Sequence, residues 1–337
     1  MKKAAFIGDG HQIARVYHGE TMASLRRELD FIADGTCLVK SDFDAVKEEL
    51  AAVEYVFSTW GMLALSAEEI REYLPSCKAV FYAAGSVQYF ARPFLENGIA
   101  VHSAWAANGV PVAEYTFAQI VLATKGFFHR LHKPGSGYIW TNRNVYVDFP
   151  GNYDITVGII GAGMIGKMVI ERLHRDLDGV RVVVFDPFLS DEKAAALWVE
   201  KCTLEELFAQ SDVISNHLAN NPQTVGMLDA HLFDRMKPNT TFINTGRGAQ
   251  IVEADMIAAL QADPSRAAVL DVTYPEPPRE DSPLYTLDNV YLTPHIAGSL
   301  GNEVRRMGEY MLSEYRHVAA GEETQYGVTL QMLETMA

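Results

Sequence analysis

Cysteine is scarce in this sequence, whose 337 residues include only Cys37, Cys77 and Cys202. The three lie far apart, are odd in number and form no Cys-x-x-Cys pair, so neither a disulfide framework nor a cysteine zinc site is indicated. We therefore predict no bound metal and a reducing compartment. A chain of this length can bury a full core without such cross-links.

Long hydrophobic runs are also missing. No segment approaches the roughly 20 apolar residues of a membrane span, and the apolar run after Lys2 and Lys3 is too short for a signal-peptide core. Lys and Arg total 28 against 43 Asp and Glu, which gives a formal net charge of −15. This negative charge repels nucleic-acid phosphates and anionic membranes, so we predict neither partner. Together these absences predict a cytoplasmic protein.

What the sequence does contain is an alternation of short apolar segments with longer amphipathic ones. The expected elements of a first series are strands at Lys3–Ile7, Val53–Ser58, Ala79–Ala83 and Ile99–His102, and helices at Met22–Ala33, Phe43–Ala52 and Ala67–Tyr73. The expected strands of a second series are Val157–Ile160, Val180–Phe185, Val213–Ser215, Thr241–Asn244, Ala268–Val272 and Val290–Leu292. Their unbroken apolar, β-branched character is typical of parallel strands buried on both faces, so we predict an α/β chain of two domains.

Two longer helices are expected outside this alternation. Val112–Thr124 is apolar nearly all round, which predicts burial in a core or an interface. In Val304–Val318 the apolar residues recur at spacings of three and four, with Glu and Arg between them. This spacing predicts one amphipathic helix near the C-terminus.

A first glycine pair, Gly8-Asp9-Gly10, follows the opening strand. A third glycine of a nucleotide-binding turn would fall at position 13, which is Ile13. Gly-x-Gly alone is common between a strand and a helix, so we interpret this pair as a plain turn rather than a nucleotide site.

A second glycine motif, Gly161–Gly166, has the full Gly-x-Gly-x-x-Gly spacing between a strand and a helix at Lys167–Leu173. Gly161 allows the tight turn, Gly163 lets the backbone approach a pyrophosphate, and Gly166 lets the helix pack close to the strand. Amides at the helix start then face the phosphates. Asp186 follows twenty residues after Gly166, at the end of the next strand, where a carboxylate binds ribose hydroxyls and repels a 2′-phosphate. The motif therefore predicts NAD rather than NADP.

Three polar residues follow later strands of the second series: Arg247, Glu276 and His295. Because the carboxyl ends of parallel strands line the ligand crevice of a doubly wound sheet, these side chains could meet at one site. An arginine fork binds a carboxylate and polarises a neighbouring carbonyl, while a histidine supplies or removes a proton and a carboxylate orients it. The three residues predict acid–base chemistry on a small acid.

From about Gly85 to Gly301 the chain resembles the D-isomer-specific 2-hydroxyacid dehydrogenases. The residues that carry the resemblance are Gly161–Gly166, Asp186, His217-Leu218 with Pro222, Met236–Pro238, Asn244–Gly248, Asp271-Val272 with Glu276-Pro277, and Pro294-His295. In this order and spacing the motifs are highly specific, whereas the N-terminal part matches only in general pattern.

The resemblance implies two parallel-sheet domains, one inserted into the other. A flavodoxin-like substrate domain would comprise residues 1–104 plus 303–337, and a Rossmann-like NAD domain residues 105–302. The C-terminal amphipathic helix fits the element that returns to the first domain. Family members are usually dimers, so a homodimer is expected.

The resemblance also implies roles for single residues. Arg247 would bind the carboxylate and keto oxygen of a 2-oxo acid, His295 would be the general acid and base, and Glu276 would pair with His295. The implied cofactor contacts are Gly161, Gly163, Met164, Ile165, Gly166, Asp186, His217, Thr245, Gly246, Arg247, Asp271 and His295. The implied substrate contacts are Gly85, Ser86, Val87, Arg247 and His295.

The chain departs from the family pattern in two places that bear on the substrate. Of the segment from Ala84 to Phe90 only Gly85 matches comfortably, and Tyr115 stands where a histidine often follows the Ala-Glu pair. The substrate therefore stays open among glyoxylate, hydroxypyruvate, pyruvate and bulkier 2-oxo acids. A metal site at His129 and His132 is disfavoured, because no carboxylate or cysteine lies beside them.

Two alternatives to an NAD-dependent 2-hydroxyacid dehydrogenase stay open from the sequence. Formate dehydrogenases resemble the same fold but have glutamine where Glu276 stands here, which disfavours them. A non-catalytic NAD(H)-sensing binding protein of the corepressor type retains similar active-site residues. That alternative would be favoured if the protein bound NADH tightly yet oxidised it with no 2-oxo acid.

Overall fold

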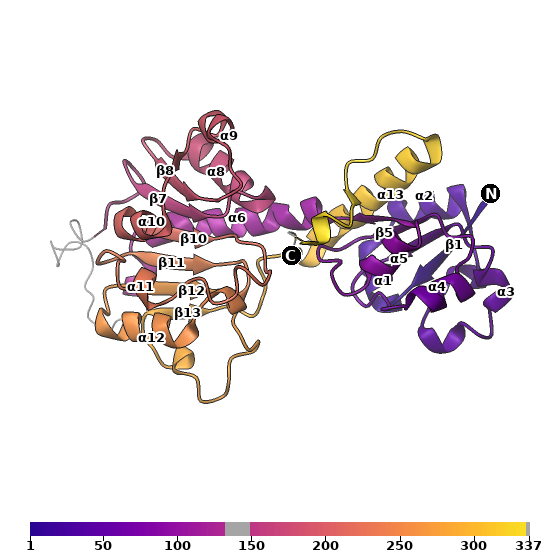
Figure 1. Cartoon of the computed structure of the whole chain (residues 1–337), viewed down its shortest axis with the longest axis horizontal. Helices are drawn as coiled ribbons and strands as arrows, with labels where there is room; N and C mark the ends of the chain where they lie inside the picture. The colour runs from indigo at the N-terminus through magenta and orange to yellow at the C-terminus, as the bar shows by residue number, and fades with distance from the viewer. Residues whose placement is uncertain (132–148, 335–337) are drawn as a thin grey trace. The chain divides into compact units, whose positions relative to one another are not determined.

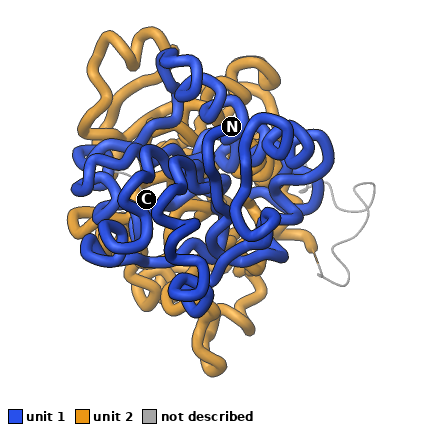
Figure 2. The backbone as a smooth tube through the Cα atoms, turned by 90° about the vertical axis from the view of Figure 1, so that its right-hand side faces the viewer, with its two compact units in different colours: residues 1–109, 299–337 blue, residues 110–298 orange. Residues whose placement is uncertain are grey.

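The computed structural model describes residues 1–131 and 149–334, and its chain divides into two compact units (Figure 1). Unit 1 comprises Met1–Gly109 and Ser299–Ala337, and unit 2 comprises Val110–Gly298 (Figure 2). Unit 2 is therefore inserted into the chain of unit 1. Each unit is an α/β layer structure around a parallel sheet, so the predicted fold class is confirmed.

Unit 1 contains a seven-stranded sheet in the order β14-β6-β5-β4-β1-β2, with β3 also paired to β1. The strands are β1 (Lys2–Ile7), β2 (Leu29–Phe31), β3 (Cys37–Leu38), β4 (Tyr55–Ser58), β5 (Ala79–Tyr82), β6 (Ala100–Ser103) and β14 (Gly327–Val328). All pairs are parallel except that of β14 with β6. The antiparallel β14 brings the C-terminal segment back to the sheet edge.

Helices cover both faces of the unit 1 sheet. They are α1 (Gly10–Val16), α2 (Glu20–Glu28), α3 (Lys47–Leu50), α4 (Ala67–Tyr73), α5 (Ala91–Glu96) and α13 (Val304–Ala320). Ala5 and Ile7 of β1 face one apolar core, whereas Ala4 and Phe6 face the other. This second core includes Met307 of α13. The amphipathic C-terminal helix predicted from residue spacing is thus confirmed, and it completes one face of the sheet.

Unit 2 contains seven parallel strands in the order β13-β12-β11-β10-β7-β8-β9. They are β7 (Thr156–Ile160), β8 (Arg181–Phe185), β9 (Glu200–Lys201), β10 (Val213–Asn216), β11 (Thr241–Asn244), β12 (Ala267–Leu270) and β13 (Val290–Leu292). From β7 the chain builds the sheet outward through β8 and β9, and it then crosses back to begin the other half at β10. The carboxyl ends of β7 and β10 therefore flank the position where such sheets bind ligands.

Helices also cover both faces of the unit 2 sheet. They are α6 (Trp105–Thr124), whose last fifteen residues belong to this unit, α7 (Phe127–Arg130), α8 (Met164–Asp176), α9 (Asp191–Ala196), α10 (Leu204–Gln210), α11 (Ala230–Phe233) and α12 (Glu253–Ala262). Val157 and Ile159 pack with α8 on one face, and Ile214 packs with α10 and α12 on the other. Across both units, no helix in the described part of the chain is long and apolar enough to span a bilayer.

Two helices predicted in unit 1 are shorter than expected. Met22–Ala33 was predicted as one helix, but α2 ends at Glu28 and Leu29–Phe31 forms strand β2. Parallel pairing of β2 with β1 buries Leu29 at the sheet edge, and this tertiary pairing overrides the local helical pattern. Within the predicted helix Phe43–Ala52, only Lys47–Leu50 is α-helical.

Candidate active site

The glycine turn joins β7 to α8 at the carboxyl end of the unit 2 sheet. Gly161 has a φ of +90°, a conformation that side chains rarely adopt, and a Cβ on Gly166 would lie 2.1 Å from the carbonyl oxygen of Gly161. Nothing lies within 4 Å of the position that a Cβ would take on Gly163. The thirteen-residue helix α8 begins at Met164 directly behind this open space. The turn therefore fits a pyrophosphate at the helix N-terminus.

Asp186 lies just beyond β8 and lines a cavity of about 600 Å³. Its Oδ2 accepts a hydrogen bond from the amide of Ala162 at 2.8 Å, and its Oδ1 accepts one from the amide of Phe188 at 2.8 Å. The cavity is lined by Val184, Phe185, Asp186, Pro187, Lys201, Cys202, Thr203, Leu204, Glu205 and Glu206. Its volume suits a small ligand. Each carboxylate oxygen keeps a further lone pair for a ribose hydroxyl, so the residues present fit the adenosine half of NAD.

His217 follows β10 on the other side of the glycine turn. A Cβ on Gly161 would lie 3.0 Å from the main-chain carbonyl of His217, which shows how closely the two segments pack. The His217 Nε2 lies 2.9 Å from Ser215 Oγ. Burial lowers the pKa of His217 to about 4, so the imidazole is neutral at pH 7. The ring of His217, which is one of the predicted cofactor contacts, is therefore uncharged and lies beside the glycine turn.

The structure brings Glu276 and His295 together, as the strand-end argument anticipated. His295 Nδ1 lies 2.6 Å from Glu276 Oε1, and the two side chains are 50% and 40% exposed. Because an ionised carboxylate only accepts, Glu276 fixes the imidazole proton on Nδ1 and leaves Nε2 for another partner. His295 itself has a φ of +56°, in the left-handed region that few side chains adopt.

Asp271, at the end of β12, holds the His295 loop in place. Its Oδ1 accepts hydrogen bonds from Thr293 Oγ1 at 2.6 Å and from the amide of Ile296 at 2.8 Å, and its Oδ2 accepts one from the amide of Ala297 at 2.8 Å. Its main-chain oxygen accepts from the amide of His295. The predicted contact of Asp271 with the nicotinamide remains a prediction. What the structure adds is a loop-holding role that motif reasoning missed.

Tyr115 on α6 extends this arrangement. Its hydroxyl lies 2.9 Å from Thr293 Oγ1. Because Thr293 gives its own proton to Asp271, the Tyr115 hydroxyl donates to Thr293. Burial raises the pKa of Tyr115, so the proton needed for this bond stays in place. The tyrosine that stands where the family often has a histidine therefore supports the loop that carries His295.

Arg247 lies in the turn after β11 and is partly buried. Its Nη1 donates to the carbonyl oxygen of Gly246 at 2.8 Å. Burial holds the pKa of Arg247 below its usual range, while the charge of Glu276 acts in the opposite direction. All three predicted catalytic residues belong to unit 2, and the charge of Glu276 acts on Arg247. Thr245 in the same turn is buried, and its Oγ1 lies 3.1 Å from Thr116 Oγ1.

Gly85, Ser86 and Val87 belong to unit 1, where they follow β5. Ser103 Oγ holds this segment by donating to the carbonyl oxygens of Ala84 at 2.9 Å and Gly85 at 2.6 Å. Within the described residues of unit 1, no group accepts a hydrogen bond from the three amides of residues 85–87. These amides could bind an anion, and their part in substrate binding stays a prediction.

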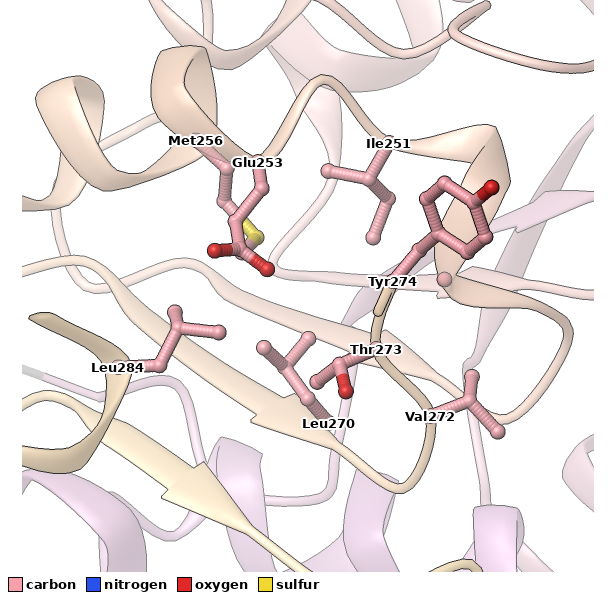
Figure 3. Close-up of a pocket in the computed structure, with 9 residues that line it drawn as sticks. Ile251, Glu253, Met256, Leu270, Val272, Thr273, Tyr274 and Leu284 are labelled. Atoms are coloured by element: carbon pink, nitrogen blue, oxygen red, sulfur yellow. The ribbon is translucent and has the colours of Figure 1, made fainter. Parts of the chain in front are cut away.

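Other candidates are less suited to chemistry. His129 Nε2 lies 2.6 Å from the carbonyl oxygen of Ser265, and His132 lies outside the described residues. Among residues 1–131 and 149–334, no three His, Cys, Asp or Glu side chains are grouped as metal ligands. Figure 3 shows a pocket in which the carboxylate of Glu253 points toward apolar side chains that include Leu284. Its volume of about 10 Å³ holds at most one water-sized sphere.

Sequence reasoning assigned no role to three buried amide side chains next to the Arg247 turn, although Asn244 belongs to a motif it named: Asn216, Asn244 and Gln250. Asn216 and Asn244 each end an apolar strand, β10 and β11, at paired positions of the sheet. A polar residue repeated at the ends of neighbouring strands is a signal that could have identified these two. Gln250 has no such signal, because it lies in a short 3-10 helix, Gly248–Gln250, outside every motif.

Residues 120–297 match the family model described as D-isomer specific 2-hydroxyacid dehydrogenase, NAD binding domain. This match covers more than half of the chain. The chain therefore belongs to the D-isomer specific 2-hydroxyacid dehydrogenase family and carries its NAD-binding domain, as the resemblance indicated.

Two relatives illustrate the similarity in sequence. D-3-phosphoglycerate dehydrogenase of Archaeoglobus fulgidus is 31% identical over 239 residues, which are 71% of this chain and 44% of that protein. D-3-phosphoglycerate dehydrogenase of Bacillus subtilis is 32% identical over 274 residues, which are 78% of this chain and 50% of that protein. The chain thus spans half or less of the length of these relatives, and their substrate does not transfer directly.

Solved structures show the same fold over nearly the whole chain. A phosphoglycerate oxidoreductase from Rhizobium etli matches with a TM-score of 0.78 and 20% identity, covering 97% of both chains. The apo form of D-mandelate dehydrogenase from Rhodotorula graminis matches with a TM-score of 0.77 and 20% identity, again covering 97% of both. At this identity the likeness establishes the fold and leaves the substrate open.

Proposed function

We propose that this chain is an NAD-dependent oxidoreductase that interconverts a small 2-oxo acid and its D-2-hydroxy acid. The observation that carries the proposal is the contact of 2.6 Å between His295 Nδ1 and Glu276 Oε1, in the unit that also holds the glycine turn. The names of the relatives support the reaction class, since they are dehydrogenases of a 2-hydroxy acid.

The catalytic residues divide the chemistry among them. Arg247 binds the substrate carboxylate through its guanidinium fork and polarises the adjacent keto oxygen. His295 donates a proton from Nε2 to that oxygen during reduction and removes it during oxidation. Glu276 keeps Nε2 directed away from itself and stabilises the charged imidazole. The bound nicotinamide supplies or accepts the hydride.

Other residues bind the two ligands. The glycine turn and the first amides of α8, at Met164 and Ile165, hold the pyrophosphate, and Asp186 holds the adenosine ribose. A carboxylate in that position repels a 2′-phosphate, which favours NAD over NADP. His217, Thr245, Gly246 and Asp271 surround the nicotinamide half, and the amides of residues 85–87 bind the substrate carboxylate.

The proposal extends to the state of the protein in the cell. We expect a cytoplasmic homodimer whose partner is a small 2-oxo or 2-hydroxy acid, with neither nucleic acid nor a membrane as partner. Light scattering on the purified protein measures its mass in solution. A monomer over a wide concentration range would contradict the dimer and leave the chemistry unaffected.

One panel tests the reaction. The purified protein is given NADH and a series of 2-oxo acids of graded size, from glyoxylate through pyruvate and hydroxypyruvate to bulkier acids, and the series is repeated with NADPH. We expect NADH oxidation with at least one acid, a D-configured product and slower turnover with NADPH. Tight NADH binding without turnover of any 2-oxo acid would contradict the enzyme and favour an NAD(H)-sensing protein.

The variant Arg247→Lys tests the role of Arg247 in substrate recognition. Lysine keeps the positive charge but cannot form two parallel hydrogen bonds across carboxylate and carbonyl. We expect a higher KM and a lower kcat/KM for the 2-oxo acid. An unchanged kcat/KM would remove Arg247 from the site.

A further inference from the structure

Three amide side chains with no exposed surface form a hydrogen-bonded group behind the Arg247 turn: Asn216, Asn244 and Gln250. The Asn216 Nδ2 donates to Asn244 Oδ1 at 3.0 Å and to Gln250 Oε1 at 2.6 Å. Buried amides are costly unless each donor and acceptor is satisfied, and in return they fix their partners in direction as well as distance. The group is therefore a rigid connection between the ends of β10 and β11.

The side chains of Asn244 and Gln250 hold the main chain of Arg247 on both sides. Gln250 Oε1 accepts a hydrogen bond from the amide of Arg247 at 3.3 Å, and Asn244 Nδ2 donates to the carbonyl oxygen of Arg247 at 3.1 Å. Asn244 Oδ1 also accepts from the amide of Gly246 at 3.0 Å. The backbone that carries the guanidinium is thus fixed by side chains rather than by a strand or a helix.

The same glutamine reaches the loop beside the glycine turn. Gln250 Nε2 donates to the carbonyl oxygens of Leu218 at 2.8 Å and Ala219 at 3.0 Å. Both of its N–H groups and its oxygen are therefore used, with no capacity left idle. Through one side chain the Arg247 turn is joined to the segment that contains His217.

Gly246 is matched to this arrangement. A Cβ at this position would lie 3.1 Å from Gln250 Oε1 and 3.2 Å from Asn216 Nδ2, which is closer than ordinary van der Waals contact. The absence of a side chain on Gly246 therefore leaves the space that the glutamine amide occupies. The space at Gly246 is thus a second observation, besides the hydrogen bonds, that the turn is built around the Gln250 side chain.

We propose that Gln250 is a positioning residue that directs the Arg247 guanidinium by fixing the Arg247 main chain against the loop of residues 217–219. The inference rests on the proposed function, because it takes Arg247 as the residue that binds the substrate carboxylate. Replacing the amide by an apolar side chain leaves the amide of Arg247 and the carbonyls of Leu218 and Ala219 without their partner. A misplacement of about 1 Å in such a group can cost about 10²-fold in rate.

The test compares two substitutions at Gln250 with a matched control. Gln250→Leu removes every hydrogen bond at similar size, and Gln250→Glu keeps the acceptor oxygen but replaces the two donors by a second acceptor. Gln261→Leu makes the same exchange at an exposed glutamine of α12 in the same unit. For the best 2-oxo acid of the panel, we expect Gln250→Leu to lose about 10²-fold in kcat/KM. Gln250→Glu should lose at least as much, because its second oxygen faces the carbonyl oxygens of Leu218 and Ala219 in a buried site, and Gln261→Leu should be like wild type.

A second readout separates positioning from general destabilisation. Fluorescence titration should show NADH binding weakened far less than kcat/KM, because the glycine turn and Asp186 are not hydrogen-bonded to Gln250, whose side-chain bonds go to residues 216, 218, 219 and 247. In an Arg247→Ala background the further change Gln250→Leu should cost less than about threefold, since the group it positions is gone. The proposal would be overturned if Gln250→Leu lowered kcat/KM as much in the Arg247→Ala background as in wild type. It would also be overturned if both Gln250 variants kept the wild-type kcat/KM. If Gln250→Leu fails to fold, the isosteric Gln250→Glu takes its place in this cycle.

Amide hydrogen exchange keeps the inference separate from the reaction. In the ligand-free protein, exchange of the peptide over residues 244–250 should be faster in Gln250→Glu than in wild type or Gln261→Leu. If wild type turned over no 2-oxo acid, the proposed function would fail, and this measurement alone would decide whether Gln250 fixes the Arg247 turn. Equal exchange in all three proteins would refute it.

Discussion

The neutral state of His217 leads to a prediction about stability against pH. Burial lowers the pKa of His217 to about 4 in the folded protein, whereas an unfolded chain has a histidine pKa of about 6.5. Below the unfolded value, the unfolded chain takes up a proton that the folded protein does not. The free energy of unfolding therefore falls as the pH decreases from about 6.5 toward 4 and regains its full value above that range.

The size of the effect follows from the same two values. At pH 5.0 the unfolded chain lies about 1.5 pH units below its histidine pKa, and each unit is worth about 1.4 kcal/mol, so His217 should cost about 2 kcal/mol relative to pH 7.5. Urea unfolding of the cofactor-free protein at both pH values measures this loss. Other groups titrate too, so the quantity of interest is the difference between wild type and His217→Gln.

The variant His217→Gln should lose about 2 kcal/mol less than wild type between pH 7.5 and 5.0. His231→Gln serves as the control, because the His231 side chain is 60% exposed in the same unit. It should follow wild type. Parallel pH dependence of His217→Gln and wild type would show that folding does not lower the pKa of His217, and the argument that burial excludes the charged ring would fail.

Three further predictions concern the proposed reaction. His295→Ala should lower kcat by about 10²–10⁴-fold with NADH binding retained, and near-normal turnover would remove it as the acid and base. Asp186→Ala should reduce the preference for NADH over NADPH by about tenfold or more, measured as a ratio of kcat/KM values; an unchanged ratio would count against its ribose contact. Gly166→Ala places a Cβ 2.1 Å from the Gly161 carbonyl oxygen and should destabilise the protein by about 1–3 kcal/mol in thermal unfolding, unlike the open position Gly163→Ala.

The sequence predicted those elements whose residue pattern follows a general physical rule. Unbroken β-branched segments predicted the parallel strands of unit 2, because strands buried on both faces leave no polar positions. The spacing Gly161–Gly166 predicted the turn, since backbone contact forbids a Cβ at its last glycine. The rule that carboxyl ends of parallel strands line one crevice anticipated the meeting of Glu276 with His295.

What sequence could not supply are contacts made by single side chains across the fold. Gln250 lies outside every periodic pattern, and three of its partners, Asn216 at the end of β10 and Leu218 and Ala219 directly after it, are 31 to 34 residues away. Asp271 was assigned to the cofactor from its motif, yet its carboxylate also holds the loop that carries His295. The end of helix α2 was missed for a related reason, because pairing with the distant strand β1 makes Leu29–Phe31 a strand.

The insertion of unit 2 into unit 1 has a consequence for biosynthesis. Unit 2 is one continuous stretch, so it can fold as soon as the ribosome has released residues 110–298. The sheet face of unit 1 that carries Phe6, Phe57 and Phe81 must wait for Met307 of α13. Until then helices α1 and α2 cover only part of this face. Unit 1 can therefore be completed only after the whole of unit 2 has been translated.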